Sequence, residues 1–439
     1  MVRALPSYLI SRLGRPAPRL RLAAGLALGQ AAGRGALAIA LLILVRHLTP
    51  EEFGDLALVL AVVGILMTVA DAGFGRLIVR DVARSTRDST TVVQELLRVR
   101  LAGVVVVVAG SGVALVILPA PFSGQIVALT VAYLAFEALA FGFENASVGA
   151  ERPGRFVAAQ SLAAVTLLTG AVVLALTETA SVGHALAILA GASTLKVCAH
   201  VFLWRAKPHA VRAAISRSRA VEAYRQALPF LGLTLLATVY YRIGVVALHA
   251  VQGARETASY AAALRVVDAV AIVAGVTFSA ISPALSRAHR DRSDSIWVVW
   301  KRSVAKCAAI VLPLAVIGAV VAPVLARVLF GEAYEQSAGD DLRLLMPGIA
   351  IMVLQSFSAA VVFMADDHRN VLRLTAFNVG ACVVASIGLS AAYGSAGAAV
   401  SLSAAELLSF TSFALLIRHN YRADAPARQR SAPPVVPPP

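Results

Sequence analysis

Arg34 and Arg242 lie near the middle of two long apolar stretches, residues 23–45 and 230–250. A charge at the centre of a bilayer costs about 2.5–3.5 kcal/mol on insertion scales, so it usually faces a wet cavity or a charged partner. Each stretch also opens one half of the chain. The two arginines therefore predict a transporter in two halves, with a cationic site for an anionic substrate.

Three further charged residues could extend this site. Lys196 lies near the middle of the apolar stretch 184–204, where it could bind substrate, pair with a carboxylate or extend its flexible stem towards water. Arg265 and Asp268 are three residues apart in the stretch 260–282 and share a helical face. They fit either a substrate site or a local ion pair that lowers the cost of insertion.

Three more carboxylates lie in apolar stretches: Asp71, Glu137 and Glu406. A carboxylate in a low-dielectric site can carry a proton, and it can also help to coordinate Na⁺. The competing interpretation is that Glu137 or Glu406 is the counter-ion of an arginine and fixes helix packing. We predict Asp71, Glu137, Asp268 and Glu406 as ion-coupling or counter-ion residues, and predict no metal site and no cofactor beyond a coupling Na⁺ or H⁺.

The composition is that of an integral membrane protein. Of 439 residues, 59% are hydrophobic and 14% are charged, against about a quarter charged in soluble domains. The apolar stretches are near 20 residues long and do not alternate with polar residues, which predicts helices and argues against a barrel. The net charge of +15 falls mostly between the stretches rather than on a soluble face, so we expect no nucleic-acid partner.

About twelve stretches are long enough to cross a bilayer. Arginine and lysine concentrate in alternate loops, whereas the opposite loops hold only Arg46, Arg255, Arg327 and Arg343, against nine carboxylates, so the positive-inside rule predicts cytoplasmic N and C termini. The predicted spans are 23–45, 56–78, 101–118, 125–146, 156–176, 184–204, 230–250, 260–282, 305–322, 344–364, 374–393 and 397–417.

The fold class that follows is an all-α polytopic membrane protein, with two lobes of six helices each. A weak echo between residues 50–58 and 255–263, each after the first span of its half, supports a parallel 6+6 repeat. The predicted parts are a basic cytoplasmic N-terminus (1–22), an N-terminal lobe (23–204), a basic cytoplasmic linker (205–229), a C-terminal lobe (230–417) and a proline-rich cytoplasmic tail (418–439).

Several segments at the ends of the predicted spans carry short motifs. They are residues 46–54 after the first span, 70–75 and 79–83 around the end of the second, 259–268 at the start of the eighth, 329–334 after the ninth and 393–399 before the twelfth. Taken in order, these segments resemble the polysaccharide and lipid-linked oligosaccharide flippases of the multidrug/oligosaccharidyl-lipid/polysaccharide exporter superfamily.

This resemblance implies a polyprenyl pyrophosphate that carries a short glycan as substrate, moved by alternating access between the two lobes without ATP hydrolysis. Arginine suits a pyrophosphate because its planar fork stays charged and can bind two oxygens at once. On this basis Arg34, Arg242, Arg265 and Lys196 are the predicted substrate residues. The implied setting is the bacterial plasma membrane, with membrane lipid around the protein and a polysaccharide polymerase and glycosyltransferases as partners.

Two other function classes remain open from the sequence. A drug or small-solute antiporter of the same superfamily would favour carboxylates over arginines in its site. A membrane glycan polymerase or ligase would place its chemistry in a sizeable outer loop, but the longest one, residues 322–343, contains no histidine. No nucleophile–base pair and no Gly-x-x-x-x-Gly-Lys phosphate loop occurs, so we predict no catalytic residue and no enzyme activity.

Overall fold

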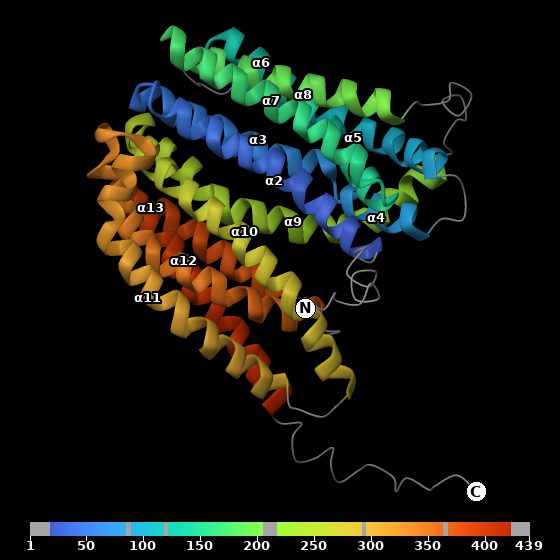
Figure 1. Ribbon diagram of the computed structural model, residues 1–439, viewed down its shortest axis with the longest axis vertical. Helices are drawn as coiled ribbons and strands as arrows, with labels where there is room; N and C mark the ends of the chain where they lie inside the picture. Colours follow the sequence, from blue (N-terminus) through green and yellow to red (C-terminus); the bar gives the residue numbers. More distant parts are fainter. Residues whose placement is uncertain are drawn as a thin grey trace, which may run out of the picture. The chain divides into compact units, whose positions relative to one another are not determined.

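The computed structural model describes residues 18–84, 89–117, 122–204, 217–291, 296–362 and 368–422 (Figure 1). Within these ranges the chain forms twelve α-helices, one 3₁₀ turn and no strand. The elements are α2 (Pro18–Leu44), α3 (Pro50–Asp71), α4 (Phe74–Arg84), α5 (Ser89–Ile117), α6 (Gly124–Gly149), α7 (Pro153–Thr177), α8 (Val182–Trp204), α9 (Arg217–Gln252), α10 (Ala254–Asp291), α11 (Ile296–Phe330), η2 (Glu332–Tyr334), α12 (Ser337–Val362) and α13 (His368–Arg422).

The helices correspond to the predicted spans, and the all-α polytopic fold is confirmed. Eight described helices are long and apolar enough to cross a membrane. α13 is two helices joined at Gly394, whose backbone is not helical (φ 59°, ψ −138°), as the predicted spans 374–393 and 397–417 require. Residues 1–17 of the predicted N-terminus, 205–216 of the predicted linker and 423–439 of the predicted tail lie outside the described residues.

The predicted second span, residues 56–78, is wrong at its end, because α3 stops at Asp71. Ala72 (φ 49°) and Gly73 (φ 81°) both have left-handed backbone, which breaks the helix. A Cβ at Gly73 would collide with the Ala227 carbonyl oxygen, so only glycine fits here. Apolar residues continue past this break as far as Val79, interrupted only by Arg76, so hydropathy did not reveal it.

The residues after the break form the short amphipathic helix α4. Its buried side chains recur at helical spacing, and Arg76 on the opposite face is exposed. The buried residues pack with parts of α5, α6 and α9 in one apolar cluster. They are Phe74, Leu77, Ile78 and Val82.

The helices group into two compact units. The first comprises Met1–His47 and Val63–Leu235, and the second comprises Leu48–Val62 and Leu236–Pro439. In the first unit, α2 packs against α7, and α6 packs against α4, α5 and α8. In the second unit, α12 packs against α10, α11 and α13 (Figure 1).

Burial separates central from peripheral helices in the second unit. The apolar window of α12 is 78% buried, whereas that of α11 is 6% buried. A helix that is apolar and yet unburied is suited to face lipid, so α11 belongs to the periphery and α12 to the centre of this unit.

Small residues let α2 and α7 approach closely. Gly25, Gly29 and Gly33 recur every four residues along one face of α2. A Cβ at Gly29 would collide with the ring of Phe156, and one at Gly33 would lie 2.7 Å from Oε1 of Gln160. Lipid tails are as apolar as leucine, so close packing of this kind is a main source of helix association in a membrane.

We expect Gly29→Leu to destabilise the first unit by about 1–3 kcal/mol, the usual cost of overpacking, because the buried ring of Phe156 leaves no room for a side chain. The measurement is the apparent melting temperature of the detergent-purified protein. Gly35→Leu is the matched control, since nothing lies within 4 Å of a Cβ at Gly35. Equal melting temperatures for the two variants would contradict the proposed role of the glycine face.

Candidate functional site

A buried ion network joins α6 and α8. The Lys196 ammonium lies 2.6 Å from Oε1 of Glu137 and 3.0 Å from Oε1 of Glu144. Ser193, one turn before Lys196, donates its hydroxyl to Oε2 of Glu137 at 2.6 Å. Glu137 and Glu144 are seven residues apart, so two helical turns bring both carboxylates to the same face of α6. Two carboxylates thus surround one ammonium that is only 6% exposed.

Arg34 on α2 is the remaining charge associated with this network. Its side chain is exposed, and within the described chain no carboxylate forms an ion pair with it. It lies within electrostatic range of Glu144. Arg34, Lys196, Glu137 and Glu144 together carry no net formal charge, but Arg34 remains open to an anion.

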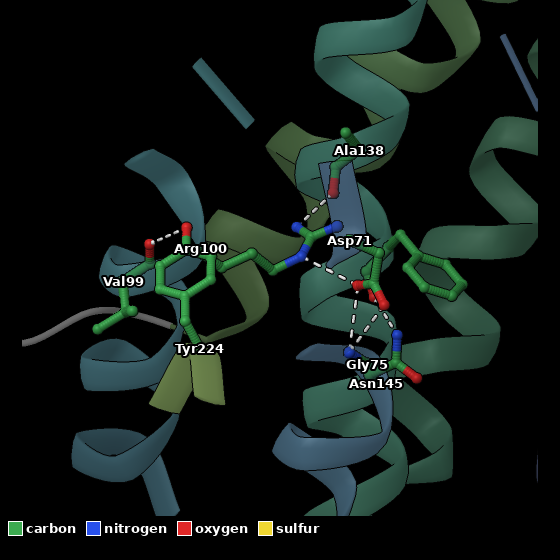
Figure 2. Close-up of polar contacts among 8 residues, drawn as sticks. Asp71, Gly75, Val99, Arg100, Ala138, Asn145 and Tyr224 are labelled. Atoms are coloured by element: carbon green, nitrogen blue, oxygen red, sulfur yellow. Dashed lines mark hydrogen bonds and ion pairs between the residues drawn. The ribbon is translucent and has the colours of Figure 1, made fainter. Parts of the chain in front are cut away.

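A second buried ion pair links α5 to the break between α3 and α4 (Figure 2). The Nε of Arg100 donates to Oδ1 of Asp71 at 3.1 Å, and its Nη1 donates to the Ala138 carbonyl oxygen at 2.6 Å. The same Asp71 carboxylate accepts the backbone N–H of Gly75 at 3.0–3.1 Å. Asp71 therefore neutralises Arg100 and also satisfies a free amide in the first turn of α4.

Arg100 itself was not predicted as an intramembrane charge. In the sequence it lies just before an apolar run, where it resembles one more arginine of a basic loop. In the structure its side chain is 2% exposed. Tyr224 adds to the same region by donating its hydroxyl to the Val99 carbonyl oxygen at 3.1 Å (Figure 2).

The second unit brings three predicted residues together. Nη1 of Arg265 lies 3.2 Å from Oδ2 of Asp268, one helical turn along α10. Nη1 of Arg242, on α9, lies 3.7 Å from the same oxygen. Two guanidinium groups thus share one carboxylate, which leaves a formal surplus of one positive charge. The side chains of Arg242 and Asp268 are 28% and 38% exposed, so the group is open to a ligand.

Glu406 on α13 stands apart from these arginines. It is 3% exposed, and Tyr240 and Tyr241 lie next to its carboxyl group. Its Oε1 has no hydrogen-bond partner within the described chain, and it lines a small cavity between α10, α12 and α13. No lysine or arginine of the described residues forms an ion pair with Glu406.

The geometry therefore sorts the predicted residues into two kinds. Lys196, Glu137 and Asp71 lie in buried networks in which each has an oppositely charged partner. Arg34, Arg242 and Arg265 remain accessible or only half neutralised. Glu144 and Arg100 were not predicted from the sequence. Glu144 lies seven residues after Glu137, and this spacing could have indicated that the two share a helical face. No local pattern indicated that Arg100 is buried. No group of three metal-ligating side chains occurs in the described residues.

We expect Arg100→Met to lower stability by about 3–5 kcal/mol, because it leaves the Asp71 carboxylate buried without its partner. The double variant Arg100→Met/Asp71→Asn should recover much of this loss. The measurement is resistance of the purified protein to thermal unfolding. Arg327→Gln is the control, since its partners Glu332 and Glu335 are exposed and surface pairs contribute about 0–1 kcal/mol. A double variant no more stable than the single one would contradict this account.

Known structures share this architecture. An inward-facing multidrug resistance MATE family transporter of the MOP superfamily matches with a TM-score of 0.67 and 16% identity, over 94% of this chain and 100% of that one. The lipid II flippase MurJ, in an inward closed conformation, matches with a TM-score of 0.68 and 10% identity, over 91% of this chain and 87% of that one. A MOP superfamily transporter from Pyrococcus furiosus matches with a TM-score of 0.61 and 15% identity, over 93% and 97%.

At these identities the likeness establishes the all-helical fold alone. Among curated proteins no sequence relative matches. The family described as "Polysaccharide biosynthesis protein" matches residues 43–339, which is more than half of the chain. This match shows that the chain belongs to that family of polysaccharide biosynthesis proteins.

Proposed function

We propose that this protein is a flippase that moves a polyprenyl-pyrophosphate-linked oligosaccharide from the inner to the outer leaflet of a bacterial plasma membrane, for surface polysaccharide biosynthesis. Membership of the polysaccharide biosynthesis family and the MOP-superfamily fold support a transporter of this class. Glycosyltransferases would supply such a substrate and a polymerase would consume it.

The observation that carries the proposal is the sharing of Asp268 by Arg242 and Arg265. A pyrophosphate offers several oxygens to the two guanidinium forks, whereas both arginines lie nearest to the same oxygen of Asp268. A pyrophosphate carries more negative charge than one carboxylate and can bind a guanidinium fork through two oxygens, so an incoming pyrophosphate can compete with Asp268. Arg34 supplies a further open cation in the first unit.

In this mechanism the two buried ion networks have a different role. Lys196 is held by Glu137 and Glu144, so we assign it to positioning α6 against α8 rather than to direct substrate contact. Asp71 holds Arg100 and the start of α4. Glu406 is the carboxylate best placed to carry a coupling proton or to contact Na⁺, because it has an unsatisfied oxygen and no cationic partner in the described chain.

We expect Arg242→Ala and Arg265→Ala each to slow flipping about 10–100-fold, since a hydrogen bond to a charged group is worth about 1.5–3 kcal/mol. The measurement is arrival of lipid-linked glycan at the outer leaflet of proteoliposomes. Arg327→Ala is the matched control, because this arginine lies at the end of α11 and is 54% exposed.

Binding of inorganic pyrophosphate provides a second readout. Asp268→Asn removes the competing carboxylate and should tighten pyrophosphate binding, whereas Arg265→Ala should weaken it. Flipping at the wild-type rate in both arginine variants would exclude the shared-carboxylate site as the substrate site.

A cation-coupled antiporter for drugs or small solutes is the second candidate, and the isolated carboxylate of Glu406 is the observation that favours it. Under the flippase proposal, proteoliposomes of the wild-type protein with an imposed pH gradient should transport a cationic dye no faster than empty liposomes. Dye transport by the wild type that is lost in Glu406→Gln would favour the antiporter instead.

A further inference from the structure

An apolar cavity of about 220 Å³ lies within the first unit, between α5, α6 and α8. It is formed by residues in the first half of α5, the second half of α6 and the last turn of α8. Its apolar lining comprises Val93, Leu97, Leu101, Leu139, Phe143, Val201 and Trp204. Neither the ion network at Lys196 nor the shared-carboxylate site of the second unit contributes a residue to this lining.

The cavity opens onto a face of the unit that is itself apolar. Two lining residues, Leu101 and Val201, are 44% and 51% exposed. Phe202, which follows Val201 in α8, is 66% exposed. Apolar side chains exposed on the helices of a membrane protein are suited to contact lipid, so this face offers hydrocarbon a way into the cavity.

Unsatisfied polar atoms also lie in the cavity wall. Both amide atoms of Gln94 are buried without a hydrogen-bond partner in the described chain, and so is Nη2 of Arg100. Buried polar groups are usually satisfied, and an exception calls for an explanation such as a bound ligand. A purely hydrocarbon occupant would leave these groups unpaired, whereas a lipid with oxygens near its chain would satisfy them.

A cationic cluster lies around the same tryptophan that closes the cavity. The guanidinium carbon of Arg155 is 4.8 Å from the centre of the Trp204 ring, and that of Arg152 is 5.7 Å away. Nη1 of Arg155 is buried and has no acceptor within the described chain. No side chain caps the start of α7 at Arg152, and the space around Gly154 in its first turn is open.

These features together match an amphiphile with a negative head. Arginines and an open helix N-terminus attract anionic oxygens, and the apolar cavity accepts a hydrocarbon chain. Trp204 is part of both the cavity and the cationic cluster, since its ring lines the cavity and contacts the two guanidinium groups. Tryptophan is enriched at the boundary between hydrocarbon and headgroups, which is the depth such a lipid would occupy.

We propose that this cavity and the adjoining arginines form a binding site for an anionic glycerophospholipid of the surrounding membrane. One acyl chain enters between α5, α6 and α8, and the phosphate binds Arg152 and Arg155 at the start of α7. The bound lipid ties α7 to α8 through Trp204. This site is separate from the proposed pyrophosphate site and does not depend on which substrate is moved.

The test is quenching of Trp204 fluorescence by brominated lipids in the full-length protein. Trp297→Phe and Trp300→Phe remove the other two tryptophans, and a retained melting transition shows that this background is folded. In proteoliposomes, dibromo-phosphatidylglycerol should quench Trp204 more strongly than dibromo-phosphatidylcholine at equal mole fraction. Arg155→Gln should reduce this preference about fivefold, the value of one basic residue at a membrane surface.

A second variant tests the cavity itself. Val201→Phe should fill it and lower quenching by dibromo-phosphatidylglycerol, whereas Val173→Phe, a residue equally exposed on α7 that lies outside the cavity, should not. The proposal is overturned if the two lipids quench equally, or if the preference survives both Arg155→Gln and Val201→Phe. It is also overturned if a polyprenyl pyrophosphate displaces the brominated lipid, since the cavity then belongs to the substrate.

Discussion

The cost of an ion in a low-dielectric environment is the constraint on which this structure depends. An unpaired buried charge costs several kcal/mol, so each buried cation needs a carboxylate at contact distance from another part of the chain. Arg100 meets Asp71, and Lys196 meets Glu137 and Glu144. These contacts determine which helices must be neighbours: α5 is held at the α3–α4 break, and α8 is held against α6.

The same constraint explains the geometry at the start of α4. A helix that stops inside an apolar run leaves unsatisfied backbone groups, which are expensive in a membrane. Asp71 accepts the Gly75 N–H there while it pairs with Arg100. The left-handed backbone at Ala72 is unfavourable by about 1–2 kcal/mol, and the surrounding contacts offset that strain. One carboxylate therefore neutralises Arg100 and also accepts a free amide at the start of α4. These two contacts favour a positioning role for Asp71 over a direct role in transport.

The number of carboxylates around each cation distinguishes structural from functional candidates better than its position in the sequence does. Lys196 is surrounded by two carboxylates and has no capacity for another anion. Arg242 and Arg265 divide one carboxylate between them and stay partly exposed. From the sequence all three were candidate substrate residues, and pairing with a carboxylate was an alternative for each of them. The difference lies in the number of carboxylates within reach, which depends on helices that are far apart in the chain.

Hydropathy and charge distribution by themselves determined the class of this protein and the number of its spans, because bilayer thickness sets the length of an apolar helix and charge is costly inside it. They also marked Arg34, Arg242, Arg265, Lys196, Glu137 and Glu406 as positions of interest. The pairing of Arg265 with Asp268 was accessible too, since residues three apart share a helical face. Only the tertiary structure decided the break at Ala72–Gly73, the burial of Arg100 and the place of Glu144 beside Lys196. Each of these arises from contacts between helices distant in sequence, and neither apolar content nor spacing within one helix reports such contacts.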